Sequence, residues 1–233
     1  MPRRQAQLGD TGCVLELYLT ELFGIAMAVA LSPLAIMPAI LMLSTARPKV
    51  TGWAFLAGWL AGLLVLTGAF SLLAGGIELY QGTPIWASWL RLLLGAALVA
   101  FGVKKWLSRN KAAGSPEWMA QIASYDGGQA LKTGVLLTTA NPKVLVFCAA
   151  AGMAIGSSEL GLAAGVWLSV AFALTAAATV ILPVVAYAVS GEAMAGPLER
   201  LKGWLERNNA ALMAALFLVL GVMLAVKGID GLR

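Results

Sequence analysis

Long apolar runs separated by short polar connections dominate the chain. A transmembrane helix needs about 20 mostly apolar residues to cross roughly 30 Å of hydrocarbon, and six segments meet this requirement. Their continuity favours helices over a β-barrel, whose strands alternate in short stretches. The pattern therefore predicts an all-α polytopic membrane protein with six transmembrane helices. The predicted spans are residues 17–43, 53–73, 86–103, 134–155, 160–190 with an interruption at Pro183, and 210–226.

Polar segments divide these spans into two halves. Residues 1–16 form a polar N-terminal tail without the apolar core of a cleavable signal peptide. Residues 104–133 are polar and contain glycines, so they are predicted to be a cytoplasmic linker. The linker joins a first three-helix repeat at 17–103 to a second at 134–233.

Lysine and arginine counts predict how the spans face the two sides of the membrane. Ten basic residues fall in the connections after spans one, three and five, and five fall on the other side. We therefore expect a multi-pass protein of the bacterial plasma membrane with both termini outside. Arg3 and Arg4 in the N-terminal tail argue the other way.

The two halves resemble each other weakly but in the same order. LSPLAIMPA in the first span aligns with ANPKVLVFC in the fourth at an offset of 109. WLAGLLVLT aligns with WLSVAFALT at 108, and VAFGV with LVLGV at 119. Because each half crosses the membrane three times, the second must be inserted upside down relative to the first. The sequence thus predicts a 3+3 inverted repeat, the architecture of many secondary transporters.

Prolines at matching positions predict that the first and fourth helices are broken, at Pro33 and Pro142. A proline lacks a backbone donor and frees the carbonyl four residues earlier, and Pro38 repeats this effect in the first span. Freed backbone groups in a membrane must face protein or a water-filled cavity. The alternative for either proline is a structural kink. The polar residues beside the breaks, which are candidates to satisfy the backbone or to bind substrate, are Ser32, Thr138, Thr139 and Asn141.

Lys143 places a charge near the middle of a predicted span. Such a charge is costly and normally has a partner or faces water. No carboxylate lies inside a predicted span except Glu21, near the outer end of the first. Either freed carbonyls and water hold Lys143, or it is neutral, or its partner is an anionic substrate, which is the interpretation we favour. The lack of buried Asp and Glu also argues against metal cations or basic amino acids as cargo.

Thr67 and Thr175 occupy equivalent positions of the repeat, and they either line one cavity or bond their own helices. The composition excludes several other classes of site. The chain has no histidine, and Cys13 and Cys148 are too far apart for a CxxC pair. The net charge of +5 is spread between apolar segments and does not indicate nucleic acid. With no nucleotide-binding motif either, we expect no metal, no cofactor and no enzymatic activity.

The motifs ALSPLAIMPAILML and TTANPKVLVFCAA, with a linker between two halves, resemble the lysine-exporter superfamily. The chain is most similar to its actinobacterial branch, the glycopeptidolipid-addressing proteins, also called sulfolipid-addressing proteins. This resemblance covers nearly the whole chain and implies export or translocation across the plasma membrane. For this branch it implies a lipid or glycolipid cargo for the cell envelope. The residues that carry the resemblance are Ser32, Pro33, Asn141, Pro142 and Lys143.

The leading hypothesis is a transporter that moves an anionic, lipid-linked substrate outward, such as a glycolipid or a polyprenyl phosphate. A small-solute exporter of the amino-acid type is the alternative. A thiol-disulfide electron carrier is a remote one, because Ala39 stands at the position that matches Cys148. A membrane scaffold would leave Lys143 without a role. The expected partners are the substrate and membrane lipids, and small-residue runs at 58–62 and 149–152 predict close helix contacts within the chain or in a homodimer.

Overall fold

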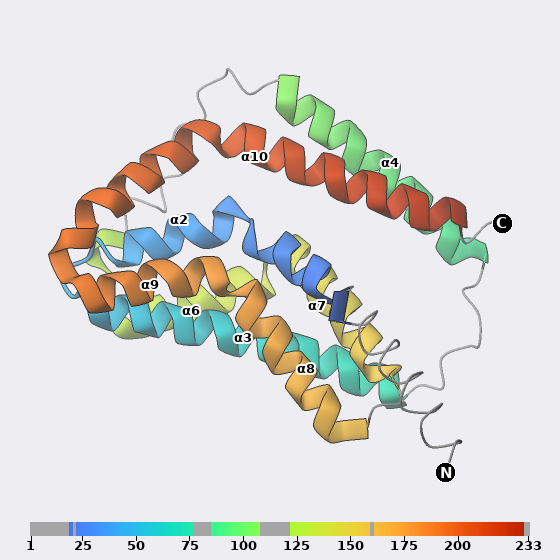
Figure 1. Cartoon of the computed structure of the whole chain (residues 1–233), viewed down its shortest axis with the longest axis horizontal. Coiled ribbons are helices and arrows are strands. Elements are labelled where there is room, and N and C mark those ends of the chain that lie inside the picture. Colours follow the sequence, from blue (N-terminus) through green and yellow to red (C-terminus); the bar gives the residue numbers. More distant parts are fainter. Residues whose placement is uncertain (1–18, 21, 77–84, 108–121, 159–160, 231–233) are drawn as a thin grey trace, which may run out of the picture. The chain divides into compact units, whose positions relative to one another are not determined.

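A computed structural model describes residues 19–20, 22–76, 85–107, 122–158 and 161–230 (Figure 1). Every regular element in these ranges is helical, which confirms the all-α prediction. The predicted tail at 1–16 and residues 108–121 of the predicted linker lie outside the described residues. Glu21, the one carboxylate expected inside a span, lies outside them as well.

The helices follow the predicted spans with shifted boundaries. The N-terminal half-helix comprises the described residues 19–20 and 22–30. The elements that follow are α2 (Pro33–Met42), α3 (Pro48–Gly76), α4 (Ile85–Leu107), η1 (Ile122–Ser124), α6 (Gly127–Thr139), α7 (Pro142–Gly156), α8 (Gly161–Ala176), α9 (Ala178–Ser190), η2 (Gly191–Met194) and α10 (Ala195–Asp230).

Six spans are confirmed only in part. Within the described residues, two helices are long and apolar enough to cross a membrane, Pro48–Ala74 and Ala178–Leu205. The number rises to four if each of two bent helix pairs counts as one span. The third and sixth predicted spans exist as α4 and α10, but their apolar helical stretches are shorter, Gly95–Lys104 and Ala210–Val219.

Both predicted helix breaks are present. The helix stops after Ala30 and restarts at Pro33, and it stops after Thr139 and restarts at Pro142. Each proline opens the new helix, where its missing donor would have no partner and its fixed φ suits the first turn. The axes of α6 and α7 differ by 68°. The predicted fourth span therefore consists of two half-helices. Pro38, by contrast, lies inside α2 without interrupting it.

Two boundaries differ from the prediction. Helix α6 begins at Gly127, seven residues before the predicted span. Its first turns carry exposed polar residues such as Lys132, and hydropathy detects the apolar part of a helix rather than its first turn. The expected interruption of the fifth span at Pro183 is wrong, because the helix breaks at Ala177 and Pro183 lies inside α9. A proline ring clashes with the carbonyl four residues before it, so the distortion falls on its N-terminal side.

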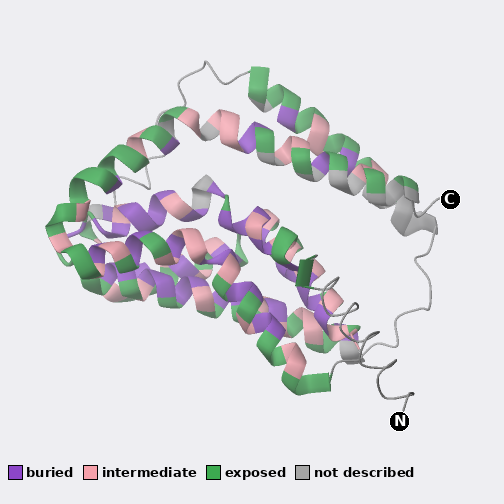
Figure 2. Cartoon of the chain, in the orientation of Figure 1, coloured by how far each residue is buried: buried purple, intermediate pink, exposed green. Residues whose placement is uncertain are grey.

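The chain forms two compact units, and each draws on both sequence halves. Unit 1 comprises Met1–Leu31, Ala54–Glu78 and Gly127–Ile181, and unit 2 comprises Ser32–Trp53, Leu79–Asp126 and Leu182–Arg233. In unit 1, one face of α7 is buried, as the spacing of Val144, Cys148, Ala151 and Ile155 shows (Figure 2). The division into two three-helix repeats stays a prediction.

In unit 1, glycines bring α3 against both half-helices of the broken span. A Cβ atom on Gly58 would collide with the carbonyl oxygen of Leu131 in α6. One on Gly152 of α7 would lie 2.5 Å from the carbonyl oxygen of Thr67 in α3. Missing side chains allow helix backbones to approach closely, and this close packing is the main way membrane helices associate. Helix α3 is therefore one uninterrupted helix that packs against both α6 and α7.

In unit 2, α4 and α10 lie side by side and run in opposite directions (Figure 1). Gly95 of α4 faces Gly221 and Ala225, whereas Gly102 faces Ala214 and Leu218 of α10. Each glycine meets backbone atoms of the opposite helix, so these contacts also depend on absent side chains.

Two threonines that the sequence reasoning missed close the C-terminal end of α2 in unit 2. Thr45 and Thr51 both donate hydrogen bonds to the carbonyl of Met42, over 3.0 Å and 2.6 Å. Both side chains are buried. They satisfy a carbonyl that has no partner within the helix, as helix ends require.

Candidate substrate site

The break between α6 and α7 is stabilised by its own polar side chains. The Asn141 side chain accepts a hydrogen bond from the Lys143 backbone N–H over 3.1 Å and caps α7. The hydroxyls of Thr138 and Thr139 donate backwards to the carbonyl of Val135, over 2.7 Å and 2.8 Å. These two threonines therefore serve the last turn of α6. Thr138 is buried and Thr139 is exposed.

Lys143 stands on the second residue of α7, immediately after the break. Its side chain as a whole is half-buried, but its Nζ atom is enclosed and has no hydrogen-bond partner among the described residues. The ring of Phe147 lies near it, with its centroid 6.0 Å from Nζ. At that distance a cation–π attraction is at its outer limit. The position near the positive end of the α7 dipole adds repulsion.

The first break differs from the second in how its polar groups are used. Ser32 occupies the N-cap position of α2, yet its side chain makes no capping bond. Ser32 is buried and its hydroxyl has no partner among the described residues. At the other end of the break, the carbonyl of Ala30 accepts a 2.6 Å hydrogen bond from the Thr179 hydroxyl of α9. Thr179 thus satisfies a carbonyl at the end of the N-terminal half-helix.

We expect Thr179→Val to destabilise the protein by about 0.5–2 kcal/mol, because the Ala30 carbonyl loses its side-chain donor at a helix end. Thermal unfolding in detergent measures the change. Thr175→Val is the matched control, since the Thr175 hydroxyl bonds only the Ala171 carbonyl of its own helix. Equal effects of the two substitutions would show that the Thr179 bond contributes nothing specific.

Thr67 and Thr175, which the predicted repeat places at equivalent positions, have different surroundings. Thr67 is fully buried in unit 1, its hydroxyl has no regular hydrogen-bond partner among the described residues, and its neighbour is the Cys148 thiol. Thr175 instead bonds its own helix and lines an apolar groove. Trp59 of α3 also has a buried indole N–H without a described partner, which the sequence reasoning missed.

Unit 1 therefore contains two buried donors without a hydrogen-bond partner among the described residues, Lys143 and Trp59, and it also contains Thr67 beside the Cys148 thiol. Lys143 and Trp59 can act only as donors. Asn141, Pro142, Thr138 and Thr139 shape the break beside them. Ser32, Pro33 and Pro38 belong to unit 2, so the structure does not assemble all predicted residues in one described unit.

Residues 22–230 match the model of the family described as Sap, sulfolipid-1-addressing protein. The chain belongs to this family. No curated protein and no solved structure matches. Family membership and the apolar helices make the chain a transmembrane protein of a family named for lipid addressing. They confirm the resemblance to the sulfolipid-addressing proteins, whereas the link to the lysine-exporter superfamily stays a prediction.

Proposed function

We propose that this protein exports or flips an anionic, lipid-linked substrate outward across the plasma membrane, with Lys143 as the contact for the anionic group. The family name supports a lipid cargo. The observation that carries the proposal is the enclosed Nζ atom of Lys143, which has no partner in the described chain. A buried ammonium group without a counter-charge is unfavourable, so an incoming anion would supply the missing partner.

The broken helix adds to this attraction. Transporters often bind anionic groups at the N-termini of half-helices near the middle of the membrane. Helix α7 begins near the middle of the broken span Gly127–Gly156 and directs its positive end to the break. Asn141 holds the first turn in place, which leaves the Lys143 side chain as the group available to the substrate.

Helix pairing supports the proposed six-span inverted repeat. Spans one and five run parallel, because residue numbers rise together along both helices. Leu19 to Ala26 line a groove with Leu168 to Thr175, and further along both helices Ala30 meets Thr179. Spans two and four also run parallel, because Gly58 meets Leu131 and Gly156 meets Ser71. Spans three and six are antiparallel. Six spans that alternate in direction would show these three relations. The repeat matches spans one, two and three with spans four, five and six. It therefore relates the pair of spans one and five to the pair of spans four and two, and it relates the pair of spans three and six to itself.

A reconstitution assay tests the function. We expect purified protein in liposomes to translocate labelled lipids with anionic head groups, phosphatidylglycerol among them, at least about tenfold faster than phosphatidylcholine with the same chains. The reason is that only an anionic group supplies the missing partner of Lys143. Quenching of head-group fluorescence by dithionite measures the rate.

Protein-free liposomes and liposomes with heat-denatured protein are the controls. Equal rates for anionic and zwitterionic lipids would contradict the role of Lys143 in selecting charge. Transport of amino acids but of no lipid would instead identify a small-solute exporter.

A further inference from the structure

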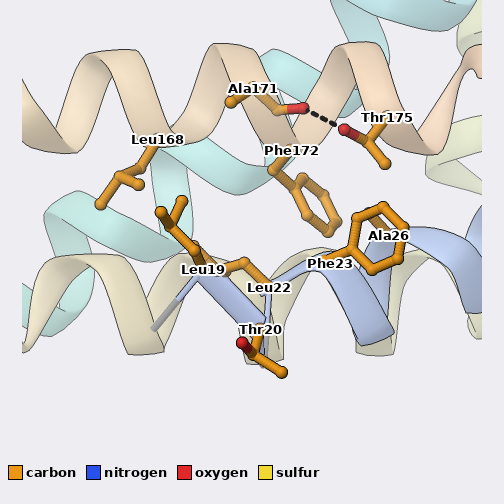
Figure 3. A pocket seen from close by; sticks show the side chains of 9 residues that line it. All are labelled: Leu19, Thr20, Leu22, Phe23, Ala26, Leu168, Ala171, Phe172 and Thr175. Carbon is orange, nitrogen blue, oxygen red and sulfur yellow. Dashed lines mark hydrogen bonds between the residues drawn. The ribbon is translucent and has the colours of Figure 1, made fainter. Parts of the chain in front are cut away.

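Unit 1 contains an apolar groove between the N-terminal half-helix and α8 (Figure 3). Its volume is about 360 Å³. None of its nine lining residues is charged. Its floor is formed by four buried side chains, Leu22, Ala26, Leu168 and Phe172.

The rim of the groove is apolar and exposed. Leu19 and Phe23 are 44% and 59% exposed, and Figure 3 shows the Phe23 and Phe172 rings facing the space between the two helices. Thr175 donates its hydroxyl hydrogen to the Ala171 carbonyl over 2.8 Å, so its polarity is satisfied within α8. Exposed apolar side chains thus border the groove, as they do on helix surfaces that face lipid.

The corresponding helix pair is closed. Pair four–two, which the repeat equates with pair one–five, is packed so tightly that a Cβ on Gly152 or Gly156 would collide with α3. Glycines thus close the contact between α7 and α3, whereas the N-terminal half-helix and α8 leave an open groove between them. Four residues beyond Ala26 and Thr175, which line the groove, the Thr179 hydroxyl bonds the Ala30 carbonyl at the break of the first predicted span.

We propose that this groove holds the hydrocarbon chain of the transported anionic lipid. This inference rests on the proposed function and extends it, because it assigns the apolar part of the substrate to a place separate from Lys143. Seven of the nine lining residues are apolar and the Thr175 hydroxyl is already bonded, so the groove offers water little and suits a hydrocarbon chain. A lateral opening lets the chain stay in lipid while the head group crosses.

Photo-labelling tests the assignment. The probes are phosphatidylglycerol and phosphatidylcholine with a diazirine at the end of one chain, and the readout is labelled peptide from α8. We expect the anionic probe to label α8 several-fold more than the zwitterionic probe. Ala171→Trp, which fills the groove from its exposed rim, should lower this labelling by about fivefold. Ala163→Trp is the matched control, because Ala163 is exposed on α8 outside the groove.

Equal labelling of the Ala171→Trp and Ala163→Trp variants would overturn the groove as the binding place. Equal labelling by both probes would assign it to bulk lipid and overturn the substrate chain as its occupant. These failures are separable from failure of the proposed function. Head-group-selective transport without labelling of the groove would support the proposed function and contradict the groove assignment. Selective labelling without transport would support the groove as a lipid site and contradict the proposed function.

Discussion

We expect Lys143→Met to lower transport by at least about tenfold and, at the same time, to stabilise the substrate-free protein. The Nζ atom of Lys143 is enclosed without a partner in the described chain, so its charge weakens the empty state. Removing an uncompensated buried polar group is worth about 1–3 kcal/mol. Losing a charged contact to the substrate costs about 1.5–3 kcal/mol, which lowers the transport rate by at least about 10-fold to 100-fold.

The two effects are measured separately, by head-group translocation in liposomes and by thermal unfolding in detergent. Lys132→Met is the matched control, since Lys132 is an exposed lysine on α6 and should change neither quantity by much. Lys143→Arg should retain part of the transport because it keeps the charge. Lower stability of Lys143→Met would show that Lys143 has a partner in the empty protein, and unchanged transport would remove it from the mechanism.

The sequence predicted the broken helices well, because proline acts locally. Pro33 and Pro142 both open half-helices, and the reason is the missing backbone donor, which needs no knowledge of neighbours. The same rule was less successful at Pro183, since a proline sets the direction of a distortion but not the residue where the helix yields. Hydropathy placed the spans but missed the polar first turns of α6.

The candidate site was predictable only in part. An isolated charge in an apolar run identified Lys143 before any coordinates. The orphaned N–H of Trp59 and the bond from Thr179 to Ala30 depend on tertiary contacts that a single sequence does not encode in any local pattern. Thr67 and Thr175 show the limit of the predicted repeat, because the positions that it makes equivalent have different surroundings.

The glycine contacts of α3 lead to the second large effect. We expect Gly58→Ala and Gly152→Ala each to destabilise unit 1 by about 1–3 kcal/mol or more, measured by thermal unfolding in detergent. The new methyl group would meet the Leu131 carbonyl in the first case and the Thr67 carbonyl in the second. These are backbone atoms of packed helices and have no rotamer through which to move away. Gly68→Ala is the control on α3, where a Cβ meets nothing within 4 Å.

Gly62→Ala distinguishes steric collision from a general intolerance of α3 to substitution. Its Cβ would collide with the Thr138 side chain rather than with backbone, so Thr138→Ala removes part of the obstruction. The double variant should therefore be more stable than the sum of the two single effects predicts, by about 0.5–3 kcal/mol. The control Gly68→Ala should be neutral or stabilising by up to about 1 kcal/mol, because alanine is the better helix former. Additive effects at Gly62 and Thr138, or equal losses at Gly58 and Gly68, would contradict the close approach of α3 to the broken span.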